Sequence, residues 1–217
     1  MVRLDNNPAG DPKKRNSIVP NKNVQTQRRR EIMEALHKCL LKKPFDKTSI
    51  KEIAATAGMN HGMLHYYFKS KEDILLNYID YELERYAGLF GEWFIAKGSR
   101  IGNDRELLKA GIDFMIRNVT LNRNLNRVFI EIWEIAIYNK KVKKKLRRFY
   151  LQWIEMVEQF ISGPIGDEEI AQKISKAIVA LHEGSVLFSI LFEPEEFSLE
   201  MLLKDFQNMF LEMLVQK

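Results

Sequence analysis

The stretch that decides the fold runs from Thr48 to Lys71 and reads TSIKEIAATAGMNHGMLHYYFKSK. Its first part spaces apolar residues three and four apart, which predicts a helix that begins at Ser49 with Thr48 as its N-cap. Gly58 follows at a point where a tight turn needs a left-handed backbone. A small residue at Ala54, a glycine four residues later and an apolar anchor six residues further, at Leu64, are the spacing of a helix-turn-helix.

The second helix of this motif presents polar and aromatic side chains on its outer face. A helix of this kind fits the major groove of DNA, where its first residues meet the edges of the bases. Two packed core helices with no role in DNA binding are the alternative, and the spacing alone leaves that alternative open. The outward residues are Asn60, His61, Met63, His65 and Tyr66.

Charge is distributed unevenly along the chain. The 217 residues include 34 Lys and Arg and 29 Asp and Glu, for a net charge of +5. Residues 1–74 hold 15 of the basic and 8 of the acidic residues, a net charge of +7, so the remainder carries −2. A basic first third on a near-neutral remainder favours a polyanionic partner, although a basic end that binds nothing would look the same.

The rest of the chain predicts helices and no strands. Residues 1–24 are rich in Asn and Pro, and we expect them to form a disordered leader. Ser70 is a good N-cap for a long fourth helix. The apolar spacing and the breakers predict nine helices. Their ranges are about 25–42, 49–57, 60–67, 71–96, 104–119, 123–139, 141–162, 167–192 and 198–215.

The sequence lacks the characteristic features of several classes of protein. The single cysteine, Cys39, rules out an intramolecular disulfide, and we expect it to be a buried structural thiol in a cytoplasmic protein. No uninterrupted run of about 18 apolar residues occurs, so we expect no transmembrane helix. Glu34 and His37 form one Glu-x-x-His motif, whereas a di-iron bundle needs two. No catalytic or phosphate-loop motif occurs, so we expect no enzyme activity, no cofactor and no metal.

Residues of about 25–75 resemble the N-terminal domain of the TetR family of transcriptional regulators. The C-terminal segments 181–192 and 194–210 resemble those of the subgroup related to the betaine-responsive repressor. The N-terminal resemblance rests on Pro44-Phe45, Thr48-Ser49-Ile50, Glu52-Ile53-Ala54, Ala57-Gly58, Gly62, Leu64, Tyr66 and Phe68-Lys69-Ser70-Lys71-Glu72.

The resemblance implies a DNA contact for each matching position. It assigns base-edge or groove contacts to Asn60, His61, Gly62 and Met63. It assigns phosphate contacts to Thr48, His65, Tyr66 and Lys71. Met63 and His65 depart from the usual threonine and tyrosine of the family, and methionine prefers an apolar contact such as a thymine methyl. The departures leave DNA binding intact and change the expected operator sequence.

The resemblance also implies an effector pocket in the middle of the chain. Large aromatic side chains on the fourth to seventh helices either fill a core or line this pocket, and the sequence leaves both open. Glu131 and Glu134 lie one turn apart on the sixth helix, where they would meet a cationic ligand if they are buried. The expected pocket residues are Phe90, Trp93, Phe114, Phe129, Trp133 and Trp153.

The last two helices are expected to form a homodimer. Both are apolar along one flank, and two such helices from each subunit would make a symmetric four-helix interface. The expected interface residues are Ile174, Ala177, Leu181, Ser185, Phe206 and Phe210.

Together these features predict an all-α protein of two domains. Residues 25–70 would form a three-helix DNA-binding domain with its helix-turn-helix at about 49–68, and residues 71–217 a helical effector-binding and dimerisation domain. We expect a repressor that a small molecule releases from double-stranded operator DNA, without any membrane partner. A helical protein-interaction module and an orphan metal-binding bundle are the alternatives.

Overall fold

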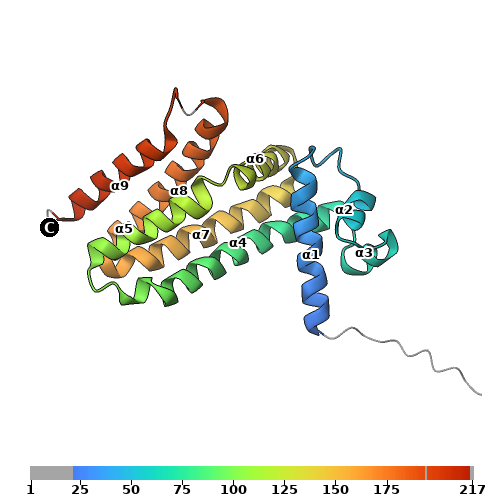
Figure 1. The fold of residues 1–217 in the computed structure, drawn as a ribbon, viewed down its shortest axis with the longest axis horizontal. Coiled ribbons are helices and arrows are strands. Elements are labelled where there is room, and N and C mark those ends of the chain that lie inside the picture. The colour runs from blue at the N-terminus through green and yellow to red at the C-terminus, as the bar shows by residue number, and fades with distance from the viewer. Residues whose placement is uncertain (1–21, 194, 216–217) are drawn as a thin grey trace, which may run out of the picture.

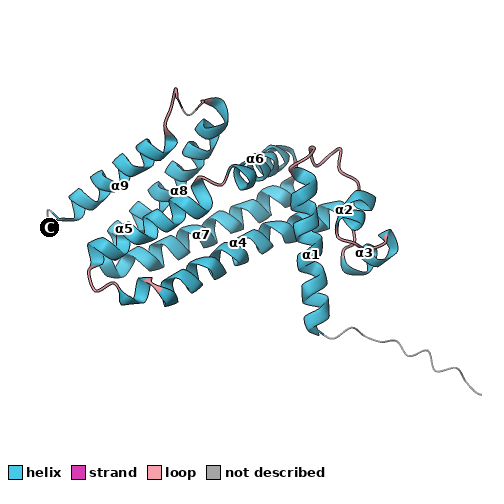
Figure 2. Cartoon of the chain, viewed as in Figure 1, coloured by secondary structure: helices cyan, strands magenta, loops and turns pink. Residues whose placement is uncertain are grey.

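The computed structural model describes residues 22–193 and 195–215. Within these ranges the chain forms nine α-helices and no strand (Figure 2), which confirms the predicted all-α fold. A 3₁₀ turn at Gly98–Arg100 and a π-helical turn at Ile116–Thr120 flank the fifth helix. The helices are α1 Lys22–Leu40, α2 Ile50–Thr56, α3 His61–Tyr67, α4 Lys71–Ala96, α5 Asp104–Met115, α6 Arg123–Tyr138, α7 Lys140–Ile165, α8 Glu168–Leu191 and α9 Leu199–Val215.

The first helix begins earlier than its sequence predicts. Residues 22–24 belong to α1, so the predicted leader at 1–24 is wrong for these three residues, and its residues 1–21 lie outside the described ranges. The first turns of α1 lie against α3, and these contacts stabilise the longer α1 helix. Gln25 Nε2 donates a hydrogen bond to the Tyr66 hydroxyl (3.3 Å), and Arg29 Nη2 donates one to the carbonyl of Tyr67 (3.1 Å).

The seventh helix ends later than its sequence predicts. We expected Gly163-Pro164 to end it, but α7 includes Pro164 and continues to Ile165. Proline in the last turn of a helix removes only one backbone donor, and the helix stops directly afterwards. Gly166 ends it with φ +69°, a left-handed conformation that glycine adopts without strain.

The helices form an elongated molecule (Figure 1). The N-terminal helices α1, α2 and α3 lie at one end, and α4 runs from them along the body of the molecule. Helix α7 packs against α4, α5, α6 and α8, while α9 packs against α5 and α8. Ion pairs between Lys141 and Glu72 (2.8 Å) and between Lys145 and Asp80 join the basic start of α7 to α4.

The apolar core does not divide at residue 70. One buried cluster joins α1, α2, α3 and the first half of α4 to α6 and the start of α7. A second cluster joins α5, the end of α7, α8 and α9. The predicted domain boundary between residues 70 and 71 therefore crosses a continuous core at the start of α4. Cys39 is buried in the first cluster, as predicted.

Helix α8 is long and apolar enough, by length and composition, to span a membrane. The search for an uninterrupted apolar run missed it, because polar residues interrupt the helix. A core helix of a globular bundle passes the same test. The residues that α8 buries include Ser175, His182 and Ser185, polar side chains that lie within the helical bundle.

Candidate DNA interface and effector cavity

The turn between α2 and α3 has the predicted geometry. Gly58 adopts φ +67°, and the amide of Met59 donates to the carbonyl of Ala54 (2.9 Å), which closes the end of α2. Ala54 and Leu64 are buried at the crossing of the two helices. The left-handed turn that the sequence predicted at Gly58 is therefore confirmed.

The start of α2 differs from the prediction by one residue. Ser49 is the N-cap, and Ser49 and Glu52 form a capping box: Ser49 Oγ accepts from the Glu52 amide (3.2 Å), and Glu52 Oε2 accepts from the Ser49 amide (2.8 Å). The predicted N-cap at Thr48 is wrong. Thr48 is only 2% exposed, and its hydroxyl donates to the carbonyl of Pro44 (3.0 Å), so in this conformation it does not face a phosphate.

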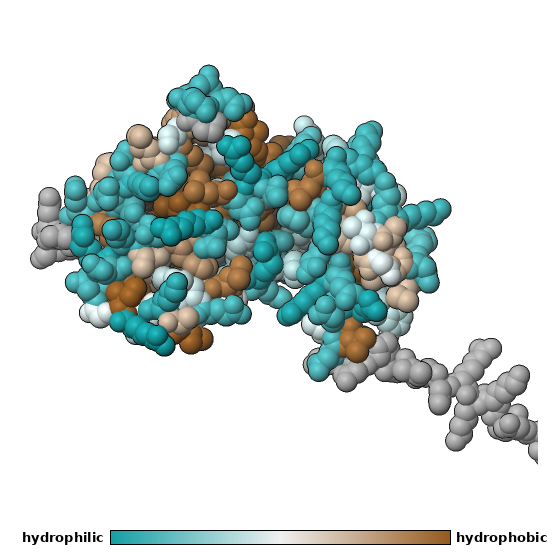
Figure 3. All heavy atoms as spheres, viewed as in Figure 1, coloured by the Kyte–Doolittle hydropathy of each residue, from teal (hydrophilic) through white to brown (hydrophobic). Residues whose placement is uncertain are grey.

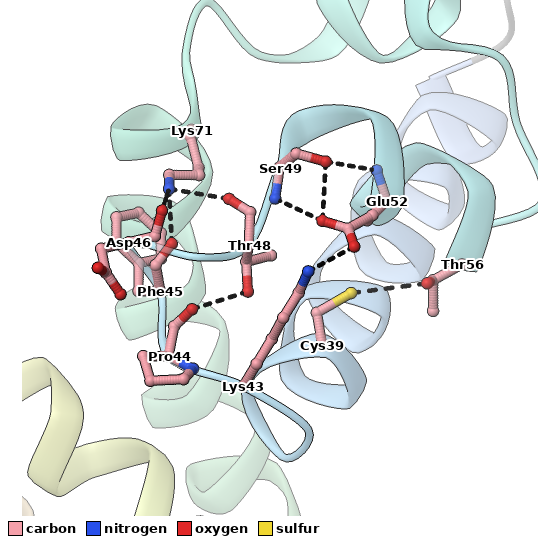
Figure 4. A network of polar contacts seen from close by, with 10 residues as sticks. All are labelled: Cys39, Lys43, Pro44, Phe45, Asp46, Thr48, Ser49, Glu52, Thr56 and Lys71. Carbon is pink, nitrogen blue, oxygen red and sulfur yellow. Dashed lines mark hydrogen bonds and ion pairs between the residues drawn. The ribbon is translucent and has the colours of Figure 1, made fainter.

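Lys71 closes the loop between α1 and α2 (Figure 4). Its ammonium donates hydrogen bonds to the carbonyls of Phe45 (2.5 Å), Thr48 (2.8 Å) and Asp46 (3.4 Å). It also lies 4.4 Å from the centre of the Phe45 ring. Burial lowers the pKa of Lys71, while Asp46 and Glu131 raise it. The ammonium of Lys71, which was predicted to bind phosphate, therefore binds backbone carbonyls of the same chain.

The outer face of α3 is exposed along its length. Asn60 caps the helix, with Oδ1 accepting from the Met63 amide (2.8 Å). The rings of His61 and His65 meet edge to face, with their centres 4.5 Å apart. Tyr66 is 61% exposed and Met63 is 43% exposed. These side chains and the backbone of α3 form a continuous surface that a DNA groove can reach.

Gly62 lies on the same exposed face. A Cβ atom built there would meet only Asn60 Oδ1, at an ordinary contact distance of 3.5 Å. The fold of this chain therefore does not itself require glycine at this position. A partner that approaches the backbone closely would require it, which agrees with the predicted groove contact.

A cavity of about 120 Å³ lies among the helices α4 to α8. Its wall is apolar and aromatic, and residues from α4, α5, α6, α7 and α8 contribute to it. Gly111 on α5 lets the Phe160 ring of α7 pass directly above the backbone. The aromatic residues of the wall are Tyr86, Phe90, Phe114, Phe129, Phe149, Trp153 and Phe160.

Most polar groups of this wall have protein partners. Arg85 donates to Glu82 Oε2 through Nη2 (2.6 Å) and Nε (3.1 Å), so the buried carboxylate of Glu82 is neutralised. His182 Nδ1 is 2.8 Å from the Thr120 hydroxyl, and burial lowers the pKa of His182 to about 4, so its ring is neutral at pH 7. His182 thus has a polar partner and also contributes to the wall. Asn126 donates to the carbonyl of Thr120 (2.8 Å).

The second carboxylate of the wall belongs to Glu183. Burial raises its pKa, while hydrogen bonds from Tyr150 and Trp133 lower it. Trp133 Nε1 also donates to the Tyr150 hydroxyl (2.8 Å). The nearest basic nitrogen in the salt-bridge geometry of the described chain is His182 Nε2, at 3.8 Å. Sequence analysis missed Glu183, because nothing in its neighbourhood along α8 marks it as facing a cavity.

The structure places the six predicted pocket residues in three different settings. Phe90, Phe114, Phe129 and Trp153 contribute to the cavity wall. Trp93 lies behind it, with its ring 5.2 Å from Phe90 and 5.3 Å from Phe114. Trp133 is 45% exposed on the outer side and reaches the wall only through its contact with Glu183. That these residues bind a ligand stays a prediction.

The two glutamates proposed for a cationic ligand lie elsewhere. Glu131 accepts a hydrogen bond from the amide of Phe45, in the loop between α1 and α2. Glu134 is exposed on α6. Neither belongs to the cavity wall, so their suggested contact with a ligand in the pocket is wrong for this cavity. The helical spacing correctly placed both glutamates on one face of α6. On that face, Glu131 meets the loop between α1 and α2, and Glu134 faces solvent.

Residues 32–78, from α1 to the first half of α4, match the family model for bacterial regulatory proteins of the tetR family. This part of the chain is a TetR-type N-terminal domain. Regulators of this family are not enzymes. A comparison with curated protein sequences finds no match.

Solved structures share the fold of this chain at low sequence identity. A protein from Saccharomonospora viridis, described as a transcriptional regulator and crystallised with choline, is 21% identical, with a TM-score of 0.67 over 86% of this chain and 96% of its own. A TetR regulator from Haloarcula marismortui is 20% identical, with a TM-score of 0.67 over 83% and 94%. The regulator FadR from Bacillus subtilis, in complex with stearoyl-CoA, is 18% identical, with a TM-score of 0.63 over 86% and 97%.

The last two helices of this chain leave an apolar surface uncovered. In the view of Figure 3 the apolar residues gather over the half of the molecule that holds α5, α8 and α9. The predicted interface residues divide between core and surface: Ser185 and Phe210 are buried within the chain, whereas Ala177 is exposed, and Ile174, Leu181 and Phe206 are partly exposed. Large exposed apolar residues on these helices and their connection are Leu187, Phe188, Ile190, Leu191, Phe192, Met201, Met209 and Met213.

Proposed function

We propose that this TetR-family regulator is a homodimeric repressor that leaves its operator when a small molecule occupies the cavity. Helix α3 would enter the major groove, and two copies of it would read two half-sites. The effector would favour the conformation of the dimer whose α3 helices do not match the spacing of the half-sites. The protein would act in the cytoplasm, in contact with chromosomal DNA.

The single observation that carries this proposal is the course of α4. At its start, Ile74 and Leu75 are fully buried in the core shared with α1, α2 and α3. Further along, Leu83, Tyr86 and Phe90 of the same helix belong to the cavity wall. A ligand that displaces the second half of α4 therefore acts on a rigid element that carries the DNA-binding helices.

Helix α6 supports the same coupling independently of α4. Phe129 of α6 contributes to the cavity wall. Two residues later, Glu131 accepts the hydrogen bond from the amide of Phe45. Phe45 in turn holds the ammonium of Lys71 at the start of α4. A shift of α6 would thus reach the loop that precedes the helix-turn-helix.

The fold leaves the chemical class of the effector open. The Saccharomonospora viridis relative was crystallised with choline, a small cation, and the Bacillus subtilis relative with stearoyl-CoA, a long anionic thioester. Both support a small-molecule effector for this chain. A cavity of about 120 Å³ favours the smaller of these two classes without rearrangement of the wall.

The first experiment is selection of bound sequences from a random pool of double-stranded DNA, repeated with candidate small molecules. We expect one enriched two-fold symmetric site, released when an effector is added. Tyr66→Ala should weaken binding to all sequences and lower the slope of log affinity against log salt by about one. Substitution of Met63 should instead change the preferred base at one position of each half-site, by about 1–3 kcal/mol.

These two variants separate the proposal from its alternative. A helical protein-interaction module without specific DNA binding would enrich no sequence. If both variants bind the selected site like the wild type, α3 is not the DNA-reading helix.

A further inference from the structure

The wall of the cavity holds one carboxyl group that has no lysine or arginine partner among the described residues. Its wall contains two carboxylates, of Glu82 and Glu183, and no lysine or arginine. Arg85 reaches Glu82 from outside the wall and cancels that charge. His182 is neutral, so it supplies no charge to its neighbour. Glu183 is left, among the described residues, without a lysine or arginine in salt-bridge range.

The carboxylate of Glu183 has two polar neighbours. Tyr150 of α7 and Trp133 of α6 lie beside it and influence its pKa, and Trp133 Nε1 donates a hydrogen bond to the Tyr150 hydroxyl (2.8 Å). Neither of these two side chains carries a charge. The side chain is 23% exposed, so the carboxylate has lost most of its contact with water. A partly buried charge in this setting gains most from a charged partner.

Aromatic rings of the cavity wall contact one another and His182, the residue before Glu183 in α8. Trp153 meets the ring of His182, the neighbour of Glu183, edge to face at 4.7 Å. Phe149 lies 6.2 Å from Trp153 and 5.1 Å from Phe129, and all three contribute to the wall. The faces of such rings attract cations, and most strongly where water is excluded.

Resting on the proposed function, we infer that the cavity binds a small organic cation whose ammonium group lies against Glu183 and whose apolar part lies among Phe129, Phe149 and Trp153. An anionic ligand would meet the charge of Glu183 with no basic side chain on the wall to balance it. A neutral ligand would leave that charge desolvated and unpaired. The volume of about 120 Å³ suits a ligand not much larger than benzene, because a protein cavity of about 150 Å³ is known to hold benzene.

The test measures binding to the full-length protein without DNA. The probes are benzylammonium and ethylbenzene, which have the same shape and differ in charge. Titration calorimetry and tryptophan fluorescence should both report binding, since Trp153 contributes to the wall. We expect the wild type to bind the cation at least about tenfold more tightly than the neutral probe. Equal affinities, or no binding of the cation, would overturn the inference.

Glu183→Gln keeps the shape of the side chain and removes its charge. This variant should lose at least about tenfold in affinity for the cation and keep its affinity for ethylbenzene. Glu134→Gln is the matched control, because Glu134 is an exposed glutamate outside the cavity wall, and it should bind both probes like the wild type. Glu183→Asp should lie between the wild type and Glu183→Gln. Cation affinity that is the same in all four proteins would refute the role of Glu183.

Release of operator DNA is measured separately and tests the proposed function. If the cation binds through Glu183 but the operator stays bound, the inference stands and ligand-relieved repression fails. If another compound releases the operator while the cation does not bind, repression stands and the inference fails.

Discussion

Lys71 shows how the environment of one side chain changes its role. In the sequence it stands where the TetR family implies a phosphate contact. In the structure, three backbone carbonyls and the Phe45 ring surround its ammonium. Hydrogen bonds to a charged group contribute more than neutral ones, so Lys71 stabilises the loop that precedes α2.

We expect Lys71→Met to lower the free energy of unfolding by about 1–3 kcal/mol, because it leaves loop carbonyls without their donor. Thermal unfolding measures this loss. Lys69→Met is the control: Lys69 is exposed nearby, and its loss should leave the melting temperature unchanged. If Lys71→Met instead melts like the wild type and lowers the salt slope of DNA binding by about one, Lys71 is a phosphate contact after all.

His182 makes the stability of the protein depend on pH. Its folded-state pKa of about 4 lies below the ordinary value of 6.5, because burial penalises the charged ring. Between pH 6.5 and 4 the unfolded chain therefore binds a proton that the folded chain does not. The contribution is constant above pH 6.5 and is lost as the pH falls toward 4, by about 3 kcal/mol.

The measurement is urea unfolding at pH 7 and at pH 4. The wild type should lose about 3 kcal/mol more than His182→Gln over this interval. Using the difference between the two proteins removes the effect of other groups, Glu183 among them, that titrate in the same range. Equal losses in the two proteins would show that His182 titrates normally in the folded state.

At the scale of the helices, Gly111 sets how closely α5 approaches α7. A Cβ atom built there would lie 2.4 Å from two atoms of the Phe160 ring. The ring is large and lies within an aromatic group with Phe90, Trp93 and Phe94. The close contact of these two helices therefore depends on the absence of one methyl group.

We expect Gly111→Ala to lower the free energy of unfolding by about 1–3 kcal/mol and to change the affinity of any cavity ligand, since Gly111 and Phe160 both belong to the wall. Gly88→Ala is the control, because a Cβ in the middle of α4 meets nothing within 4 Å. It should stabilise the protein by up to about 1 kcal/mol. Thermal unfolding compares the two, and a stabilised Gly111→Ala would contradict the predicted clash.

For the molecule as a whole, α8 and α9 expose more large apolar side chains than is usual on the surface of a monomer. Leu187 and Leu191 are exposed on α8, the helix that is long and apolar enough to span a membrane. Large exposed apolar patches mark interfaces. A symmetric dimer would cover this surface and hold two α3 helices at a defined spacing, as two half-sites of an operator require.

We expect the wild type to be a dimer at micromolar concentration and Leu187→Glu to be a monomer, because the carboxylate would be buried at the interface. Leu151→Glu is a closely matched control: Leu151 on α7 and Leu187 on α8 are both 54% exposed. It should remain a dimer. Light scattering gives the mass, and the monomer should also bind its operator more weakly, since the two reading helices are no longer linked. A monomeric wild type would end the dimer proposal.

The sequence by itself determined the local structure of this protein. The all-α fold, the helix-turn-helix and the cap at Ser70 follow from residues within one or two turns of each other. Gly58 is the clearest case: its left-handed turn needs glycine whatever the rest of the fold does. The helix bounds that moved, at α1 and α7, moved by a few residues at the ends, where contacts with other helices compete with local preference.

Only the tertiary structure decided which groups meet across the molecule. Lys71 meets carbonyls more than 20 residues away, Glu131 meets an amide 86 residues away, and Glu183 lies beside a cavity whose wall comes from five helices. Helical periodicity places a residue on one side of its own helix, but the partner on that side depends on how the helices pack. The partner decides whether a charged side chain such as Lys71, Glu131 or Glu183 stabilises a loop, joins two parts of the chain or binds a ligand. The reason is that burial and neighbouring charges set the free energy of the charged form.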